Sequence, residues 1–260
     1  MFVRNDWFIC PQPVPTAAKR LFCFPHAGVG TSTFRNWIGA LGPDVEVVLA
    51  QLPGREGRFG QPLYNCISDL VPPLVQHMAR YLDRPFALYG HSMGGTIAFE
   101  AARLIRETWR VQPERLFVGA TPAPQLPWAH SPLRDLPEEQ FLREIQIRYG
   151  GIPAQILGDA ELREAFMPIL RADIAMVETY AYNDAPPLDC GITVFGGLQD
   201  AMVSRTSLEA WRRQTASQFS LHMVAGNHLF LRSASMPMLQ LIAGDLNAVL
   251  EKQAAVIQNF

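Results

Sequence analysis

Six short segments of the chain are almost continuously apolar, and patterns typical of helices lie between most of them. Continuous apolar runs are typical of parallel strands that are buried on both faces, whereas a strand with one wet face alternates between apolar and polar residues. The predicted strands are residues 20–25, 45–50, 86–89, 115–119, 192–196 and 219–224. Strands that alternate with helices predict an α/β fold with a mostly parallel central sheet flanked by helices. Such sheets carry their functional residues where the strands end.

The spacing of apolar residues predicts where the helices lie. In one segment apolar residues recur at every fourth position, and Ser68 stands before them where a helix cap is expected. These apolar residues are Leu70, Leu74, Met78 and Leu82. A second stripe spans residues 162–177, where Pro168 predicts a kink or a division into two helices.

One region interrupts the alternation of strands and helices. The segment from about residue 125 to residue 182 combines a Pro-rich connector with helical patterns and contains no strand pattern. We therefore expect one domain over residues 1–260, in which residues 1–124 and 183–260 form the core. A helical insertion between two core strands predicts a lid over the functional site. The alternative is that these helices add packing at the edge of the sheet.

Composition and charge exclude several classes of function. The chain has 260 residues, a formal net charge of −2 and no block of Lys and Arg, so the sequence predicts no nucleic-acid binding. The first residues lack the apolar core of a signal peptide, and no apolar run approaches the ~20 residues of a membrane-spanning helix. The four cysteines form no CxxC pair, which favours reduced thiols in the cytoplasm over disulfides or a zinc site. No metal and no bound cofactor are expected.

The five residues from Gly90 to Gly94, Gly-His-Ser-Met-Gly, follow a predicted strand and precede a helical run. This strand–GxSxG–helix order predicts a nucleophile elbow, and with it the α/β-hydrolase fold. The chain must reverse sharply to lift the side chain of Ser92 above the sheet, and the two glycines have no side chains that would clash across the turn. The N–H groups at the start of the new helix then face the site, where they can hold a developing oxyanion.

A serine becomes an effective nucleophile only beside a base that a third group orients. In this fold the acid and the histidine follow the serine along the chain. Asp200 lies just after the strand predicted at 192–196, and His228 lies just after the strand predicted at 219–224. Both therefore share the edge of the sheet with Ser92. We predict that Ser92 is the nucleophile, that His228 is general base and then general acid, and that Asp200 orients the imidazole.

The other histidines and acids fit these roles less well. His222 lies inside a predicted strand, and we expect His91 to face away from the reacting group. Asp173 lies in the predicted insertion, where a solvated charge on a helix is the alternative to a functional role. The remaining candidates are His130 in the connector, His77 on a helix, and Asp184 and Asp189, which precede the penultimate strand.

The second donor to an oxyanion is expected from the loop after the first core strand. This loop, Phe24–Gly30, has small residues where a backbone must approach a substrate. The backbone N–H groups of Ala27 and Met93 are therefore the predicted oxyanion hole. We expect His26 to hold the loop in place and not to take part in the reaction.

Taken together, these motifs resemble those of the type II thioesterases, the discrete editing hydrolases of polyketide and nonribosomal peptide synthesis. Phe24–Gly28 is similar to the first loop of that family, and Leu52–Glu56 is similar to its LPGRE segment. Gly90–Gly95 matches its elbow, and Gly226–Leu231 resembles its histidine motif, in which the family more often has Gly or Asp than Asn227. The resemblance covers nearly the whole chain, and the first two segments are its most specific parts.

The resemblance implies a substrate and a partner. The substrate would be an aberrant or stalled acyl group on the phosphopantetheine thiol of a carrier domain, in a nonribosomal peptide or polyketide assembly line such as a siderophore pathway. Acyl-loaded carrier domains would be the partners, and they would bring the phosphopantetheine with them. The resemblance also implies a monomer. Ser92 would form an acyl-enzyme, and water activated by His228 would release the acid.

Three other functions use the same residues differently. The chain could be a general carboxylesterase, a medium-chain fatty acyl-carrier thioesterase, or a non-catalytic scaffold that docks carrier domains. An intact set of serine, acid and histidine argues against the scaffold. A basic patch for an acidic carrier would include Arg55, Arg58 or Arg84, and ordinary solvated arginines are the alternative.

Overall fold

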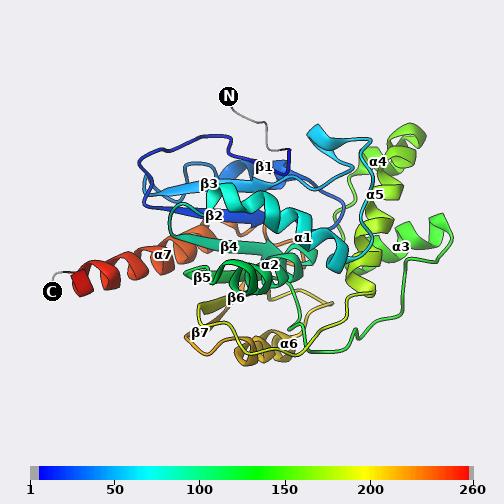
Figure 1. Ribbon diagram of the computed structural model, residues 1–260. Coiled ribbons are helices and arrows are strands. Elements are labelled where there is room, and N and C mark those ends of the chain that lie inside the picture. The colour runs from blue at the N-terminus through cyan, green and yellow to red at the C-terminus, as the bar shows by residue number, and fades with distance from the viewer. Residues whose placement is uncertain (1–5, 258–260) are drawn as a thin grey trace.

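A seven-stranded sheet forms the centre of the computed structural model, which describes residues 6–257 and, within its last helix, side chains up to residue 248 (Figure 1). The strands are β1 (Phe8–Ile9), β2 (Lys19–Phe24), β3 (Val45–Ala50), β4 (Phe86–His91), β5 (Arg115–Gly119), β6 (Gly191–Gly197) and β7 (Phe219–Val224). Their order is β1-β3-β2-β4-β5-β6-β7. The β1–β3 pair is antiparallel and every other pair is parallel.

All six predicted strands form, and their bounds differ from the predicted ones by at most two residues. The mostly parallel α/β fold is therefore confirmed. Every residue of β2 to β6 is buried, which explains why these strands read as continuous apolar runs. The sequence did not reveal β1, because its two residues are too few to make a pattern.

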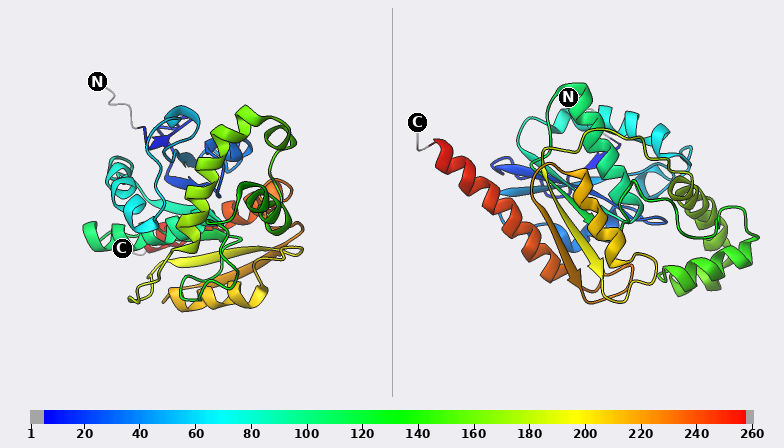
Figure 2. Two further views of the ribbon diagram at one scale, coloured as in Figure 1. Left: turned by 90° about the vertical axis from the view of Figure 1, so that its right-hand side faces the viewer. Right: turned by 90° about the horizontal axis from the view of Figure 1, so that it is seen from below.

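Helices cover both faces of the sheet (Figure 2). They are α1 (Ile67–Met78), α2 (Met93–Trp109), α3 (Glu138–Arg148), α4 (Ala154–Gly158), α5 (Ala160–Glu178), α6 (Arg205–Glu209) and α7 (Ser235–Ile257), with short 3-10 turns η1 (Thr31–Trp37), η2 (Glu56–Arg58), η3 (Ala79–Tyr81) and η4 (Ala210–Gln214). None of the helices within residues 6–257 combines the length and the apolar character needed to span a bilayer.

Two details of the helices differ from the prediction. The helix α1 already begins at Ile67 with Cys66 as its cap residue, so Ser68 lies inside the first turn and does not cap it. The helix α5 continues through Pro168, so of the two predicted alternatives, a kink or a division into two helices, the division is wrong. A proline removes one backbone hydrogen bond, but the buried residues Met167 and Leu170 beside it pack the helix against its neighbours.

Successive residues of a strand point to opposite faces, and this divides the core into two clusters. Phe22 and Leu88 belong to a cluster with buried residues of α1, α2 and α6. Leu21 and Tyr89, one residue away along the same strands, belong to a cluster with buried residues of η1 and α7. The sheet is therefore held between two layers, and its carboxyl edge is left free for the loops.

The helices α3, α4 and α5 lie between β5 and β6 in the chain and lie at the right of Figure 1. They bury a cluster of their own beside the two core clusters. Its buried members are Leu133, Phe141, Leu142, Ile145, Ile152, Met167, Leu170 and Ile174. The insertion is thus a small packed unit and not a loose loop.

Candidate active site

The turn between β4 and α2 carries Ser92 at the carboxyl edge of the sheet. Ser92 has φ 52° and ψ −118°, a conformation that costs a non-glycine residue on the order of 1–3 kcal/mol. Two hydrogen bonds hold Ser92 there. The N–H of Ser92 donates to the Gly119 carbonyl at 2.7 Å, and the Thr121 hydroxyl donates to the Ser92 carbonyl at 2.9 Å. A Cβ at Gly90 would lie 2.0 Å from the carbonyl oxygen of Gly94, so the tight turn needs glycine there.

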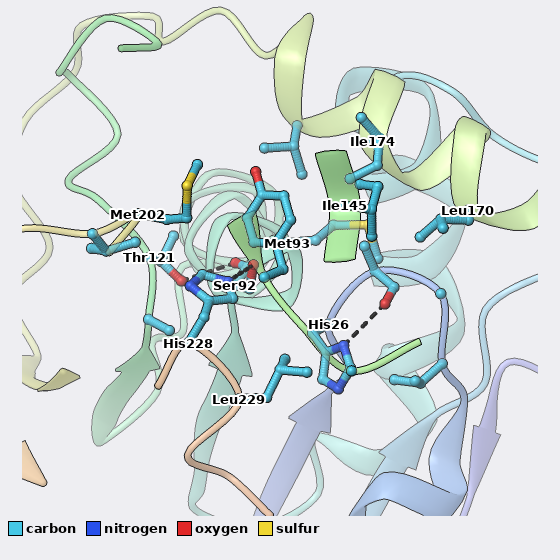
Figure 3. A pocket seen from close by; sticks show the side chains of 18 of the residues that line it. His26, Ser92, Met93, Thr121, Ile145, Leu170, Ile174, Met202, His228 and Leu229 are labelled. Atoms are coloured by element: carbon cyan, nitrogen blue, oxygen red, sulfur yellow. Dashed lines mark hydrogen bonds between the residues drawn. The ribbon is translucent and has the colours of Figure 1, made fainter. Parts of the chain in front are cut away.

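Ser92, His228 and Asp200 form a continuous chain of hydrogen bonds. Nε2 of His228 lies 2.9 Å from Oγ of Ser92 (Figure 3), and Nδ1 of His228 lies 2.9 Å from Oδ2 of Asp200. The other carboxylate oxygen of Asp200 accepts the N–H groups of Met202 at 2.9 Å and Val203 at 3.2 Å. A carboxylate fixed in this way accepts Nδ1–H and leaves Nε2 free to take a proton from the serine. The structure thus brings together the three residues that the sequence singled out.

His91, the residue before Ser92, contacts the backbone of His228. Its ring is fully buried, and its Nε2 lies 2.8 Å from the backbone carbonyl oxygen of His228. Its Nδ1 lies 3.1 Å from the hydroxyl of Tyr89. Burial, with the nearby His26 and His228, lowers the pKa of His91 well below its usual range, so the ring stays neutral and donates Nε2–H to the carbonyl. No sequence signal could have shown this contact, since 137 residues separate its two partners.

The loop after β2 faces the start of α2. Met93 is the first residue of α2, so its N–H has no partner within the helix, and both Met93 and Ala27 line the cavity that contains Ser92. Nδ1 of His26 lies 3.0 Å from the carbonyl oxygen of Ala27 (Figure 3). Burial lowers the pKa of His26 to about 3, which keeps the ring neutral. A neutral ring bonded within the loop is the contact expected of a residue that holds the loop.

A cavity of about 740 Å³ opens over Ser92. The insertion supplies much of its apolar wall through residues such as Ile145, Leu170 and Ile174 (Figure 3). Tyr149, which follows α3, packs its ring at a steep angle against His228 with the centroids 5.0 Å apart. Burial raises the pKa of Tyr149, so its phenol stays neutral beside the histidine. The cavity therefore offers room for an apolar group directly above the serine.

The other candidate histidines have different surroundings. His222 stacks on Phe195 and His77 stacks on Trp7, with ring centroids 5.7 Å and 5.5 Å apart. His130 lines the cavity, and its Nε2 lies 3.2 Å from a backbone carbonyl oxygen. None of these contacts joins the chain of hydrogen bonds at Ser92.

Two of the rival acids lie at surface hydrogen bonds. Asp184 accepts from the Tyr182 hydroxyl at 3.3 Å, and Asp189 accepts from the Gln112 amide at 2.7 Å. Among the side chains that the structure describes, residues 6–248, no group of three or more His, Cys, Asp or Glu is arranged to hold a metal ion.

Asp173 and three arginines differ from what the sequence suggested. Asp173 is fully buried and pairs with Arg55, so it is not a solvated charge of the insertion. Arg55 and Arg58 are only 6% exposed, and Arg84 donates to three backbone carbonyls between residues 14 and 17. Neither the basic patch nor its alternative, solvated arginines, therefore describes Arg55 and Arg58, because these side chains are used inside the fold. Periodicity alone could not reveal partners that lie far apart in the sequence.

Known proteins resemble this chain in sequence and in structure. The thioesterase domain family matches residues 19–247. The gramicidin S biosynthesis protein GrsT of Aneurinibacillus migulanus is 40% identical over 247 residues, which cover 95% of this chain and 96% of GrsT. The thioesterase RedJ from the prodiginine pathway of Streptomyces coelicolor is 33% identical with a TM-score of 0.82, over 91% and 92% of the two chains. YbtT, a type II thioesterase from the yersiniabactin NRPS/PKS pathway, is 28% identical with a TM-score of 0.82, over 92% and 97%.

Proposed function

The chain belongs to the thioesterase domain family, and from this premise we propose that it clears aberrant or stalled acyl groups from the phosphopantetheine arms of carrier domains. It is a thioester hydrolase, and the resemblance to type II thioesterases is confirmed. The names of GrsT, RedJ and YbtT connect them to three different biosynthetic pathways. The proposed substrate is therefore the carrier-bound thioester itself and not one particular acyl group.

One observation carries the proposal. The two hydrogen bonds of 2.9 Å that join Asp200, His228 and Ser92 end at the floor of an apolar cavity of about 740 Å³. A serine activated by an oriented histidine is suited to acyl transfer, and the cavity has the size of a site for a small molecule or an acyl chain. The proposed roles are those of nucleophile for Ser92, base and acid for His228, and orienting carboxylate for Asp200.

In the first half of the proposed reaction, Oγ of Ser92 attacks the thioester carbonyl carbon while Nε2 of His228 takes the hydroxyl proton. The carbonyl oxygen becomes an oxyanion, which the N–H groups of Ala27 and Met93 would stabilise. When this intermediate collapses, the C–S bond breaks and His228 returns the proton to the departing sulfur. A thiol with a pKa of about 8.5 leaves far more readily than an amine, so a thioester acylates Ser92 more easily than an amide would.

In the second half, water replaces the carrier thiol. His228 takes a proton from the water as its oxygen bonds to the acyl carbon, and the same two N–H groups hold the new oxyanion. The bond to Ser92 then breaks, His228 returns the proton to Oγ, and the free acid leaves. Side chains, backbone amides and water supply every group in this scheme, so we propose that the enzyme needs no bound cofactor.

The structure also supports proposals about a lid, the oligomeric state and the cellular compartment. The insertion covers the cavity, and we propose that it acts as a lid that closes around the acyl group. All groups of the proposed reaction come from one chain, which supports action as a monomer. The four cysteines are unpaired, which supports a reducing cytoplasmic compartment.

The test is hydrolysis of an acetyl-loaded carrier protein beside p-nitrophenyl acetate, by the wild type, Ser92→Ala and Ser207→Ala. Ser207 also lines the cavity, but its hydroxyl donates to the Ser204 carbonyl at 2.7 Å and lies outside the proposed triad. We expect the carrier to be turned over faster than the ester. Ser92→Ala should lower kcat by at least about 10³-fold, since the nucleophile of a serine hydrolase supplies most of its rate, and Ser207→Ala should stay near the wild type.

Other outcomes favour the other functions. Turnover of the ester with an untouched carrier would favour a general carboxylesterase. A strong preference for medium-chain acyl carriers over acetyl carriers would favour a thioesterase of fatty-acid synthesis. Binding of the carrier without hydrolysis of either substrate would favour a scaffold.

A further inference from the structure

A buried ion pair ties the insertion to the core beside the proposed oxyanion hole. Arg55 follows β3, and Asp173 lies on α5. Nη1 and Nη2 of the Arg55 guanidinium donate to Oδ2 and Oδ1 of Asp173 at 2.5 Å and 2.8 Å. The side chain of Asp173 is 0% exposed and that of Arg55 is 6% exposed. A bidentate contact of this kind fixes the carboxylate in orientation as well as in position.

The same carboxylate also holds the loop after β2. Oδ2 of Asp173 accepts the backbone N–H of Gly28 at 2.8 Å. Gly28 has φ +76°, and a Cβ there would lie 3.0 Å from Cδ1 of Leu170 and 3.1 Å from Cζ of Phe166. The helix α5 therefore lies directly on the loop at this residue. Gly28 is the residue after Ala27, so this hydrogen bond restrains the backbone that carries the N–H proposed to face the oxyanion.

The residue after Arg55 holds the first residues of η1, directly after this loop. The carboxylate of Glu56 accepts the backbone N–H groups of Thr31 at 2.8 Å and Ser32 at 3.0 Å. It also accepts the hydroxyl of Thr31 at 2.5 Å. Two adjacent residues thus fix the second half of the loop after β2 and the turn that follows it, Glu56 directly and Arg55 both through Asp173 and by a contact of 3.4 Å with the Val29 carbonyl.

We propose that Asp173, oriented by Arg55, is a positioning residue for the oxyanion hole. The proposal rests on the function proposed above, in which the N–H of Ala27 holds the oxyanion. Catalytic hydrogen bonds act at full strength only when the donor is held within about 0.5 Å of its productive position. The N–H of Gly28 bonded to Asp173 supplies this constraint from a helix of the insertion.

Stability alone does not explain a buried pair of this kind. Desolvation of two charges offsets most of their attraction, so an apolar pair of similar volume often stabilises a fold equally well. The pair that joins Arg163 of α5 to Glu138 of α3, at 3.1 Å, has both side chains at least one-third exposed and stays within the insertion. Of these two pairs on α5, it is the Arg55–Asp173 pair, which reaches the loop after β2, that is enclosed. The Arg55–Asp173 pair also fixes α5 to the core. When the proposed lid opens, we therefore expect α3 and α4 to move and α5 to stay in place.

The experiment compares two double variants that remove the ion pair without leaving one buried charge. Arg55→Met with Asp173→Leu leaves no acceptor for the N–H of Gly28. Arg55→Met with Asp173→Asn keeps an amide oxygen that can accept it. Glu138→Gln, which removes the exposed ion pair, is the control. Thermal unfolding establishes that each variant is folded.

Three readouts are expected to separate the two double variants. For the Leu variant, kcat on an acyl thioester should fall about 10- to 100-fold with KM changed by less than about 3-fold, because an oxyanion donor acts in the transition state. The inhibition constant of a trifluoromethyl ketone, which forms an oxyanion on the serine, should rise by the same factor. The Gly28 amide should exchange with solvent faster. The Asn variant should lie between the Leu variant and the wild type in all three, because its amide oxygen can accept the Gly28 N–H but is no longer oriented by Arg55, and Glu138→Gln should lie near the wild type.

Equal kcat, equal inhibition and an equally protected Gly28 amide in the Leu and Asn variants would overturn the proposal. Amide exchange at Gly28 reports on the contact whether or not the protein hydrolyses thioesters. If the wild type were inactive but the Leu variant alone lost protection at Gly28, the contact would stand and the proposed function would fail. If the wild type were active and the Leu variant kept its kcat, the positioning role alone would fail.

Discussion

The carboxyl edge of the sheet and the helical insertion border the same cavity, but they are held in place differently. At the edge, Ser92 follows β4, Asp200 follows β6 and His228 follows β7, so the pairing of parallel strands brings the three together. The insertion has its own buried cluster and reaches the core through side chains, as in the Arg55–Asp173 pair, whose partners are 118 residues apart.

This difference separates the chemistry from the choice of substrate. Residues on the edge depend on backbone register, which a change in a surface helix leaves intact. The wall residues of the insertion depend on side-chain packing, which a single substitution can alter without moving a strand. We therefore expect changes at the edge, and at Asp173 which holds the loop after β2, to affect all substrates alike, and changes in the wall residues of the insertion to affect them by size.

Asp200→Asn is expected to have the largest effect, and it should affect every substrate equally. An amide in place of the carboxylate favours the imidazole tautomer that cannot accept the serine proton, and the same change in a serine protease lowers kcat by about 10⁴-fold. The measurement is kcat for acetyl and decanoyl thioesters. Asp189→Asn is the control, since Asp189 accepts a hydrogen bond from Gln112 at 2.7 Å and lies at an exposed contact. A nearly normal rate in Asp200→Asn would mean that another acid orients His228.

Ile145→Phe is expected to discriminate between substrates. Ile145 lines the cavity and is 4% exposed, so a larger side chain takes up space that a long acyl group needs. We expect kcat/KM for a decanoyl thioester to fall about 10- to 100-fold, while the value for an acetyl thioester changes by less than about 3-fold. Ile147→Phe is a matched control on the same helix, because Ile147 is 68% exposed. Equal losses for both acyl groups would show that α3 supports the reacting groups themselves.

The comparison also shows what a sequence can reveal. The strands, the elbow and the three residues at the strand ends could be predicted because each depends on a short stretch of chain, such as a buried apolar run or a Gly-His-Ser-Met-Gly turn. The proposed oxyanion donors came from the same local reasoning. The walls of the cavity could not be predicted residue by residue, since they arise from the packing of α3 and α5 against distant loops.

Long-range side-chain contacts were the main source of error. The sequence left Asp173 between a functional role and a solvated charge, and Arg55 between a basic patch and a solvated side chain, whereas the fold buries the two against each other. The contact of His91 with the His228 carbonyl was equally invisible. Neither charge nor periodicity encodes which of many distant residues will be the partner, because that depends on how the whole chain packs.

Lowering the pH is expected to destabilise the protein through the buried histidines at the edge of the sheet, and this effect should be smaller than those of the two substitutions above. Burial lowers the pKa of His26 from its ordinary value of 6.5 to about 3 in the folded protein. Below pH 6.5 the unfolded chain therefore binds a proton that the folded chain does not. The stability that the neutral ring contributes is fully present above pH 6.5 and is lost as the pH falls from 6.5 towards 3.

The loss expected from His26 is at most about 1.4 kcal/mol for each pH unit in this window. His91, whose pKa is also lowered by burial, adds to it in the same direction. The measurement is the free energy of unfolding by urea at pH 7, 6 and 5, for the wild type and His26→Gln. Glutamine does not titrate, so the variant should lose stability less steeply as the pH falls, whatever its stability at pH 7. Parallel slopes for the two proteins would show that the loop opens to admit the proton before the protein unfolds, and the edge would then be the more mobile of the two regions.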